Sequence, residues 1–420
     1  MTRWSFETRQ VHAGARPDPA TGARATPVYQ TTSFVFDDAT HAARSFALRD
    51  LETHAYTRLS NPTTAVVEER LADLENGYAA VAVASGQAAT ALAVLNVARA
   101  GEHVVSASTL YGGTYNLFAY TLKDLGIAVD FVREPDSPEA WRAAVRPNTK
   151  AFYAESVGNP LGNVLDVQAV AAVAHEVGVP LIVDNTVPTP YLSRPLDHGA
   201  DVVVHSTTKF LSGHGTGIGG AIIDSGQFDF SPWPQFSQPD PSYNGLVFGD
   251  FGQLAFALRL RTKLVRDLGP AVSPFNSFLL LQGLETLSLR IRRHVDNARA
   301  IASWLAERVP TVHYAGLPGS PWHGAAQRYM PDGVGAVVAF ELAGLRAGER
   351  FVDRLELFSH LANIGDVRSL VIHPASTTHA QLSPEQQLAS GVTPGLVRLS
   401  VGLEGIDDLI ADLERGLRHA

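Results

Sequence analysis

The segment DVVVHSTTKFLSGHG, residues 201–215, says most about the fold and chemistry of this chain. Its three consecutive valines are typical of a buried strand, and hydroxyl-bearing residues and Lys209 follow directly. Lysine occurs at only four positions, whereas arginine supplies nearly all the other positive charge. A buried lysine can lose its proton and act as a nucleophile, which arginine cannot do. Taken alone, the segment fits an amine nucleophile and an ordinary surface lysine about equally well.

Composition restricts the classes of protein to consider. The chain has 420 residues, 45% of them hydrophobic, and a formal net charge of -9, which argues against a nucleic-acid partner. The absence of cysteine excludes disulfides, thiolate metal sites and thiol catalysis. No apolar run approaches the roughly 18 residues of a membrane span, and the N-terminus does not resemble a signal peptide. We therefore expect a soluble, cytoplasmic protein without a membrane partner.

Short hydrophobic strands alternate with helices along the first half of the chain. Strands are expected at 79–85, 103–107, 128–132, 150–156, 180–185, 201–205 and 219–224, and helices at 62–75, 87–98, 114–126 and 167–178. This alternation predicts an α/β fold with a mostly parallel central sheet covered on both faces.

Three regions are expected in sequence order. Residues 1–60 are irregular and predict an N-terminal arm, residues 61–265 a large domain, and residues 266–420 a smaller α+β C-terminal domain. Within them, residues 225–262 are rich in proline and aromatic residues and predict an ordered insertion or lid. The pattern of 274–308 predicts one long helix.

Polar or glycine-rich residues follow most of the predicted strands. Because ligands bind at the carboxyl ends of parallel strands, these positions are candidate site residues. They are Ser85, Gly86 and Gln87, then Tyr111, then Glu155 and Asn159, then Asp184, and finally Ser206, Thr208 and Lys209. Each has an ordinary structural explanation when taken alone, such as a helix start, a cap or a surface loop.

Together, these residues fit one ligand, pyridoxal 5'-phosphate. A helix start at Gly86, with the hydroxyls of Ser206 and Thr208, suits a phosphate. An acid such as Asp184 can keep a pyridine nitrogen protonated, a flat side chain such as Tyr111 can stack on the ring, and Lys209 can form a Schiff base.

At these residues the chain resembles the pyridoxal-phosphate enzymes of cysteine and methionine metabolism, over about residues 8–417. The motifs that carry the resemblance are YTRLSNPT (56–63), SGQAA (85–89), LYGGTY (110–115), ESVGNP (155–160), VDNT (183–186), HSTTK (205–209), SPFNSFLLLQGLETLSLR (273–290) and VRLSVGLE (397–404). The resemblance implies an aspartate-aminotransferase-like fold. It also implies a homo-oligomer, expected to be a tetramer built as a dimer of dimers.

The resemblance assigns roles to cofactor-binding residues. Tyr56 and Arg58 match a pair that crosses a dimer interface to the neighbour's cofactor phosphate. Ser85, Gly86 and Gln87 match the phosphate-binding turn, and Gln87 replaces a methionine that is frequent in the family.

The resemblance also implies how substrate is bound and protons are moved. Arg398 matches an arginine that binds the substrate carboxylate, and Asn363 lies in the stretch beside that site. Asn159 and Glu155 match positions that line the pocket, and Tyr111 matches a tyrosine that assists proton transfer. Lys209 must act as base and acid in turn, so its pKa is expected near the working pH.

Within the family, the chain most resembles the O-acetylhomoserine sulfhydrylases. Methionine γ-lyases usually have a cysteine where Gly113 stands, and the stretches 369–379 and 239–245 also resemble the sulfhydrylase branch. The expected reaction is γ-replacement on O-acetyl-L-homoserine by sulfide or a thiol, giving homocysteine or methionine and acetate. Cystathionine γ-synthase and methionine γ-lyase activities are the alternatives.

Other interpretations of the same letters have less support. The glycines at 215, 217 and 220 match a dinucleotide-binding pattern, but they precede a strand instead of following one. Ser206 and Lys209 match a serine–lysine hydrolase motif without its companion motifs. The paired histidines at 205 and 214, and at 373 and 379, lack metal-binding spacing and carboxylate support. No metal is therefore expected, and these histidines are interpreted as pocket or core residues. A regulatory protein that only binds the cofactor would need a DNA-binding module, for which no sequence remains.

Overall fold

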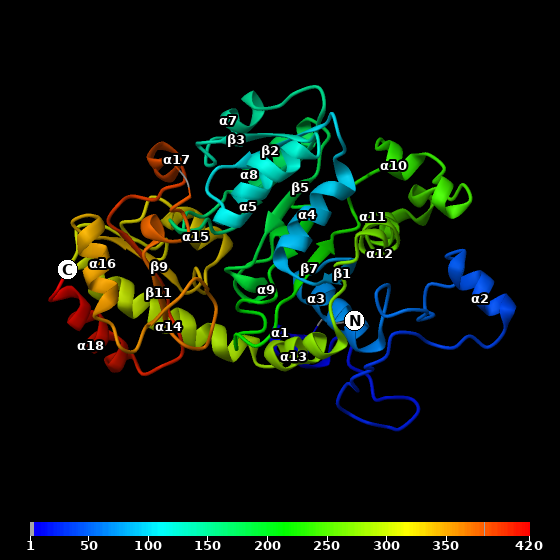
Figure 1. The fold of residues 1–420 in the computed structure, drawn as a ribbon, viewed down its shortest axis with the longest axis horizontal. Coiled ribbons are helices and arrows are strands. Elements are labelled where there is room, and N and C mark those ends of the chain that lie inside the picture. Colours follow the sequence, from blue (N-terminus) through cyan, green and yellow to red (C-terminus); the bar gives the residue numbers. More distant parts are fainter. Residues whose placement is uncertain (1–3, 382) are drawn as a thin grey trace.

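The larger of two β-sheets has seven strands in the order β1-β7-β6-β5-β4-β2-β3. The computed structural model describes residues 4–381 and 383–420 (Figure 1). The seven strands are β1 (Ala79–Val83), β2 (His103–Ala107), β3 (Ala128–Val132), β4 (Thr149–Glu155), β5 (Leu181–Asp184), β6 (Val202–His205) and β7 (Gly220–Asp224). Their positions agree with the strands expected from the alternating pattern.

The strands of this sheet are parallel except at β7. β7 runs antiparallel to both of its neighbours, β1 and β6. The loop from Ser206 to Gly219 joins β6 to β7 without a crossover helix, and a direct connection of this kind can pair only antiparallel strands. The expected mostly parallel sheet is confirmed, with β7 inserted between β1 and the parallel strands.

Helices pack against this sheet, α3 on β1 and β7, α4 on β6 and β7, and α8 on β5. The α-helices up to residue 268 are α1 (Phe6–His12), α2 (Ala39–Phe46), α3 (Pro62–Glu75), α4 (Gly86–Val97), α5 (Gly112–Asn116), α6 (Leu122–Asp124), α7 (Pro138–Ala143), α8 (Val167–Glu176), α9 (Thr189–Leu192), α10 (Pro234–Ser237), α11 (Ala255–Arg259) and α12 (Arg266–Leu268). Shorter helical turns are Leu117–Thr121, Pro195–His198, Pro241–Tyr243, Phe248–Leu254, Leu260–Val265 and Pro374–Ser376.

Local sequence explains where the two site-forming helices begin. Asn61 caps α3 by accepting the N–H of Thr63, with Pro62 in the first turn, and Ser85 caps α4 by accepting the N–H of Ala88. α3 ends at Asn76, whose φ of 62° is left-handed, as expected from the Asn-Gly stop.

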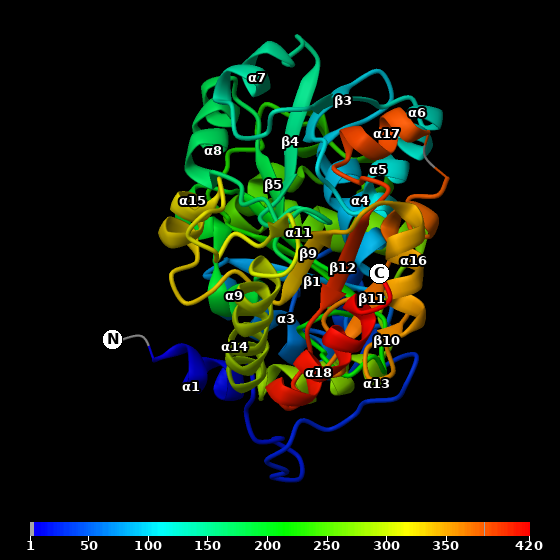
Figure 2. The same cartoon turned by 90° about the vertical axis from the view of Figure 1, so that its left-hand side faces the viewer.

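The second sheet belongs to the C-terminal part of the chain and has the order β10-β11-β12-β9-β8 (Figure 2). Its strands are β8 (Val312–His313), β9 (Val337–Glu341), β10 (Ser359–His360), β11 (Leu370–Ile372) and β12 (Leu396–Ser400). The accompanying helices are α13 (Pro274–Leu284), α14 (Leu287–Ala306), α15 (His323–Tyr329), α16 (Leu345–Asp353), α17 (Pro384–Ala389) and α18 (Ile406–Leu417). β12 lies between two antiparallel neighbours, β11 and β9, so Arg398 at its centre has a fixed position.

Two helices expected to be continuous are interrupted. The stretch 274–308 forms α13 and α14, which are separated at Glu285 and Thr286. The stretch 114–126 contains a π-helical turn between α5 and α6. The hydrophobic pattern continues across both interruptions, which explains why the pattern alone predicts a single helix.

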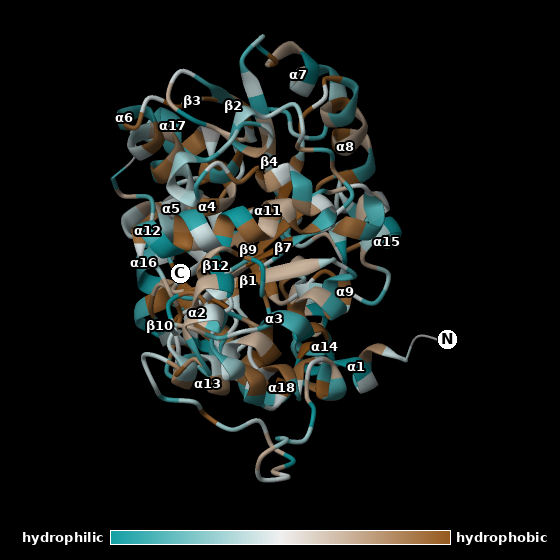
Figure 3. Cartoon of the chain, turned by 90° about the vertical axis from the view of Figure 1, so that its right-hand side faces the viewer, coloured by the Kyte–Doolittle hydropathy of each residue, from teal (hydrophilic) through white to brown (hydrophobic). Residues whose placement is uncertain are grey.

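The N-terminal arm extends from the body of the chain after α1, which packs on α3. No residue of α2 is buried, and Figure 1 shows α2 reaching away from the sheets. In Figure 3, which is viewed from that side, α2 lies in front of the rest of the chain. Val35 and Phe46 in this part of the arm are 95% and 70% exposed.

The proline-rich segment lies away from the start of α4. Gln235 donates to the carbonyls of Asn96 and Val97 at the last turn of α4. Twelve residues of helix separate this end from Gly86, about 16 Å at 1.5 Å per residue. Gln235 therefore lies at the opposite end of α4 from Gly86.

Candidate functional site

Lys209 lies in the loop that follows β6, with its amine turned toward the C-terminal domain. The Nζ donates a hydrogen bond to Oδ1 of Asn363. Burial, and then the positive charge of Arg398, lower the pKa of Lys209 from 10.5 to about 8. A substantial fraction of this amine is therefore neutral at mildly alkaline pH.

Arg398 connects both parts of the chain at this site. Its guanidinium donates to Oδ1 of Asn159 at 3.0 Å and to the carbonyl of Asn363 at 3.3 Å. Arg398 is 5% exposed, no acidic side chain pairs with it among the described residues, and its Nε lacks a partner there. Burial lowers its pKa to about 10. A buried arginine without an acid partner is suited to a carboxylate supplied by a ligand.

Two carboxyl groups lie side by side in this part of the sheet. Glu155 of β4 and Asp184 of β5 are register partners. Burial raises the pKa of both groups, and the charge of Asp184 raises that of Glu155 further. Glu155 accepts the N–H of Tyr111 at 2.6 Å, and Asp184 accepts the N–H of Thr186 at 2.9 Å.

The start of α4 touches the loop that carries Lys209. A Cβ added to Gly86 would lie 2.6 Å from Cβ of Ser206, so only glycine allows this approach. The first-turn N–H groups of α4 have no acceptor within the helix, which suits an anion. The Thr208 hydroxyl donates to the carbonyl of Gly219 and accepts its N–H, and these bonds fix the loop.

Tyr111 and Gln87 belong to a second loop at the same edge. Gln87 donates to the carbonyl of Gly113 at 3.1 Å and so fastens this loop to the start of α4. Tyr111 is 48% exposed, which leaves its ring free to contact a ligand.

His379, interpreted from the sequence as a pocket or core histidine, is buried close to these groups. This side chain is buried, its Nε2 has no partner among the described residues, and its Nδ1 bonds the Thr378 hydroxyl at 2.9 Å. It lies near Gly112, where an added Cβ would be 3.7 Å from its Nε2. Burial and the charge of Arg398 lower its pKa to about 4. Only the neighbouring motifs hinted at such a position, because histidine spacing carried no signal.

Tyr56 and Arg58 do not join the other candidate residues within one chain. The Arg58 guanidinium lies 5.4 Å from the centre of the Tyr56 ring and donates to the carbonyl of Arg266 at 2.7 Å. In the described part of the chain, no hydrogen bond or ion pair connects either residue to Lys209 or Asp184.

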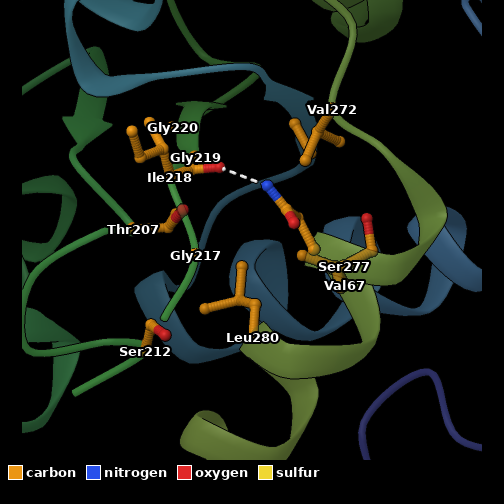
Figure 4. Close-up of a pocket in the computed structure, with 12 residues that line it drawn as sticks. Val67, Thr207, Ser212, Gly217, Ile218, Gly219, Gly220, Val272, Ser277 and Leu280 are labelled. Carbon is orange, nitrogen blue, oxygen red and sulfur yellow. Dashed lines mark hydrogen bonds between the residues drawn. The ribbon is translucent and has the colours of Figure 1, made fainter. Parts of the chain in front are cut away.

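A small cavity lies behind the glycine-rich loop after Lys209 (Figure 4). Its volume is about 10 Å³, room for roughly one water molecule, so it is not a substrate site. Asn276 donates to the carbonyl of Ile218 at 2.9 Å across it and anchors the loop to α13.

Two other kinds of site are absent from residues 4–381 and 383–420. No group of histidine and acidic side chains there is arranged to hold a metal ion. None of the helices in the same residues is long and apolar enough to cross a membrane.

Comparisons with known proteins agree with this geometry. Residues 7–418 match the sequence profile of the family described as Cys/Met metabolism PLP-dependent enzyme. An O-acetyl-L-homoserine sulfhydrylase from Leptospira meyeri is 54% identical, covering 98% of this chain and 96% of its own. A sulfhydrylase of the same name from Corynebacterium glutamicum is 52% identical, covering 99% and 97%.

A solved structure extends the comparison to the fold. The structure described as an O-acetylhomoserine (thiol)-lyase from Campylobacter jejuni is 38% identical, with a TM-score of 0.96. The match covers 99% of this chain and 100% of that one, which holds a pyridoxyl-lysine monophosphate residue.

Proposed function

Because this chain belongs to the Cys/Met metabolism family of PLP-dependent enzymes, we propose that it replaces the acetoxy group on the γ-carbon of O-acetyl-L-homoserine with sulfide or a thiol. The products are acetate and homocysteine, or methionine when the thiol is methanethiol. The observation that carries the proposal is the convergence of Lys209, Asn363 and Arg398. Relatives that are 50–54% identical over nearly their whole length are named for this reaction.

The residues at the strand ends fit pyridoxal phosphate. The close approach of Gly86 to Ser206 leaves the N–H groups of the α4 start beside hydroxyls, which suits the phosphate. Asp184 would pair with the pyridine nitrogen, and the Tyr111 ring would stack on the cofactor. When bound, the cofactor withdraws electrons from the substrate carbons next to its amino group.

Binding and orientation of the substrate are assigned to the C-terminal side of the site. Arg398 would grip the α-carboxylate with two parallel N–H groups, and Asn159 and Asn363 hold the guanidinium in place.

Proton transfer is assigned to Lys209. Its pKa of about 8 lets the amine take a proton from the substrate α-carbon and return one later in the same turnover. Glu155 accepts a hydrogen bond from the backbone N–H of Tyr111. This contact orients Tyr111, the second residue assigned to these proton transfers.

The N-terminal arm is proposed to take part in the oligomer interface. Tyr56 and Arg58 are directed to the cofactor phosphate of a second copy, in a tetramer built as a dimer of dimers. Their separation from Lys209 within one chain and the exposed apolar residues of the arm support this arrangement. A cytoplasmic location is part of the same proposal.

Product analysis tests the reaction. Purified protein is given O-acetyl-L-homoserine with sulfide, and parallel samples replace sulfide with L-cysteine or contain L-methionine alone. Homocysteine formed only with ester and sulfide supports the proposal, and Lys209→Ala should abolish it. Cystathionine in the cysteine sample would indicate a cystathionine γ-synthase. Methanethiol and 2-oxobutanoate from methionine would indicate a methionine γ-lyase.

A further inference from the structure

A chain of buried polar groups lies behind Asp184, outside the set of residues assigned so far. His205, the last residue of β6, has its Nε2 2.6 Å from Oε1 of Glu75 at the end of α3. Both side chains are fully buried. Asn185 donates to the same Oε1 at 2.8 Å, so one carboxylate oxygen connects the residue after Asp184 with the residue before Ser206.

The same network also reaches β4. Ser156 donates to Oδ1 of Asn185 at 2.7 Å and contacts the carbonyl of Asp184 at 2.9 Å. The N–H of Asn185 is bonded to the carbonyl of Val204 in β6. Three adjacent strand ends are therefore tied to α3 through Glu75.

Glu75 and His205 are charge partners only of each other in this network. Within the described residues, Glu75 has no lysine or arginine partner, and its Oε2 and the Nδ1 of His205 have no hydrogen-bond partner. An ionised carboxylate in a fully buried site needs a cation, because an unpaired buried charge is very unfavourable. His205 is the only group in contact that can supply one, by carrying a proton.

A positive charge on His205 lowers the pKa of the Asp184 carboxyl group. Four residues face the Asp184 carboxyl group. Thr186 donates hydrogen bonds to it, Glu155 and Tyr153 approach it from β4, and His205 approaches it from β6. Burial favours the neutral acid at position 184, whereas a charge on His205 favours the carboxylate. The neutral form would not hold a protonated pyridine nitrogen.

We propose that Glu75 and His205 form a buried ion pair that positions Asp184 and keeps it ionised for the cofactor ring. The proposal rests on the cofactor role of Asp184 in the proposed function and adds two positioning residues to it. Neither residue touches the cofactor in this scheme, because both act through the backbone and the charge of their neighbours.

The test measures cofactor binding as a function of pH. Apoenzyme is titrated with pyridoxal phosphate alone between about pH 5.5 and 9, and the dissociation constant is obtained from tryptophan fluorescence. Glu75→Gln keeps the shape but removes the carboxylate charge, and His205→Asn removes the imidazole. His103→Asn is the matched control, because His103 is equally buried, lies near Asp130 and starts β2 at the opposite edge of the sheet.

Both test variants are expected to lose affinity mainly on the acid side. His205→Asn removes the positive charge beside Asp184 directly, and Glu75→Gln removes the carboxylate that keeps that charge on His205. Loss of a nearby opposite charge raises a carboxyl pKa by about 1–3 units, so the acid limb of the binding profile should move up by about one pH unit or more in both variants. The control should keep the acid limb of the wild type.

Three results would overturn the proposal. They are an unchanged acid limb in Glu75→Gln, a loss of affinity that is equal at every pH, and the same shift in His103→Asn. If His205→Asn does not fold, Glu75→Gln decides the question by itself. No ester or sulfide is used, so failure here is distinguishable from failure of the proposed reaction, which product analysis detects separately.

Discussion

Replacing Lys209 by methionine should change how the stability of the apoenzyme depends on pH. Methionine is similar in length but cannot be charged. In the folded apoenzyme the pKa of Lys209 is about 8, against 10.5 for an ordinary lysine. This difference corresponds to about 3 kcal/mol in the free energy of unfolding.

The sign follows from proton binding. Between about pH 8 and 10.5 the unfolded chain holds a proton on Lys209 that the folded chain has lost. The stability of the wild type therefore rises with pH across this window, relative to a chain without the amine. Below about pH 8 the full cost of burying the ammonium is present, and above about pH 10.5 it is absent.

The assay is urea unfolding of both apoproteins at pH values from 7 to 11, followed by far-ultraviolet circular dichroism. The difference in unfolding free energy, Lys209→Met minus wild type, should fall by about 3 kcal/mol as pH rises through the window. Loss of the hydrogen bond to Asn363 adds a constant offset and does not affect this slope. Other groups titrate identically in both proteins and cancel. Parallel curves for the two proteins would refute the assignment of a lowered pKa to Lys209.

Three further experiments test other parts of the site. Gly86→Ala should weaken cofactor binding about tenfold in a fluorescence titration, because overpacking against Ser206 costs about 1–3 kcal/mol. Gly319→Ala is the control: its added methyl group meets open space, so cofactor affinity should not change. Arg398→Lys should raise KM for the ester at least about tenfold in steady-state assays, with a smaller loss in kcat, because an ammonium cannot make two parallel bonds; a loss confined to kcat would contradict this role. Arg58→Ala and Lys209→Ala should each be inactive alone, but refolded together they should recover about one quarter of wild-type activity, because half of randomly mixed dimers have one intact site; no recovery would place Arg58 in its own chain's site.

The residues at the strand ends were predictable because their arrangement follows from topology alone. Once strands alternate with helices, parallel strands place their carboxyl ends at one edge of the sheet, whatever the details of packing. This rule predicts that Gly86, Asp184 and Lys209 lie at one edge of the sheet, and Gly86 does approach Ser206, three residues before Lys209. Motif resemblance then added Arg398 and Asn363, which lie in the other half of the chain.

The antiparallel insertion of β7 was not predictable in the same way. The residues of β7 have the same hydrophobic pattern as the parallel strands. Only the absence of a crossover helix after β6 distinguishes an antiparallel strand from a parallel one here. The two interrupted helices, 274–308 and 114–126, also differ from their hydrophobic patterns, because packing against neighbouring elements decides where a long helix breaks.

By itself, the sequence determined the alternation of strands and helices, the caps of α3 and α4, and the chemistry available at each strand end, because these depend on residues close together in the chain. Only the tertiary structure decided that Lys209 bonds Asn363, that Arg398 lies against Asn159, and that Glu75 pairs with His205. Each of these pairs joins residues more than 100 positions apart. Their contact depends on how whole helices and sheets dock, and no local propensity encodes that geometry.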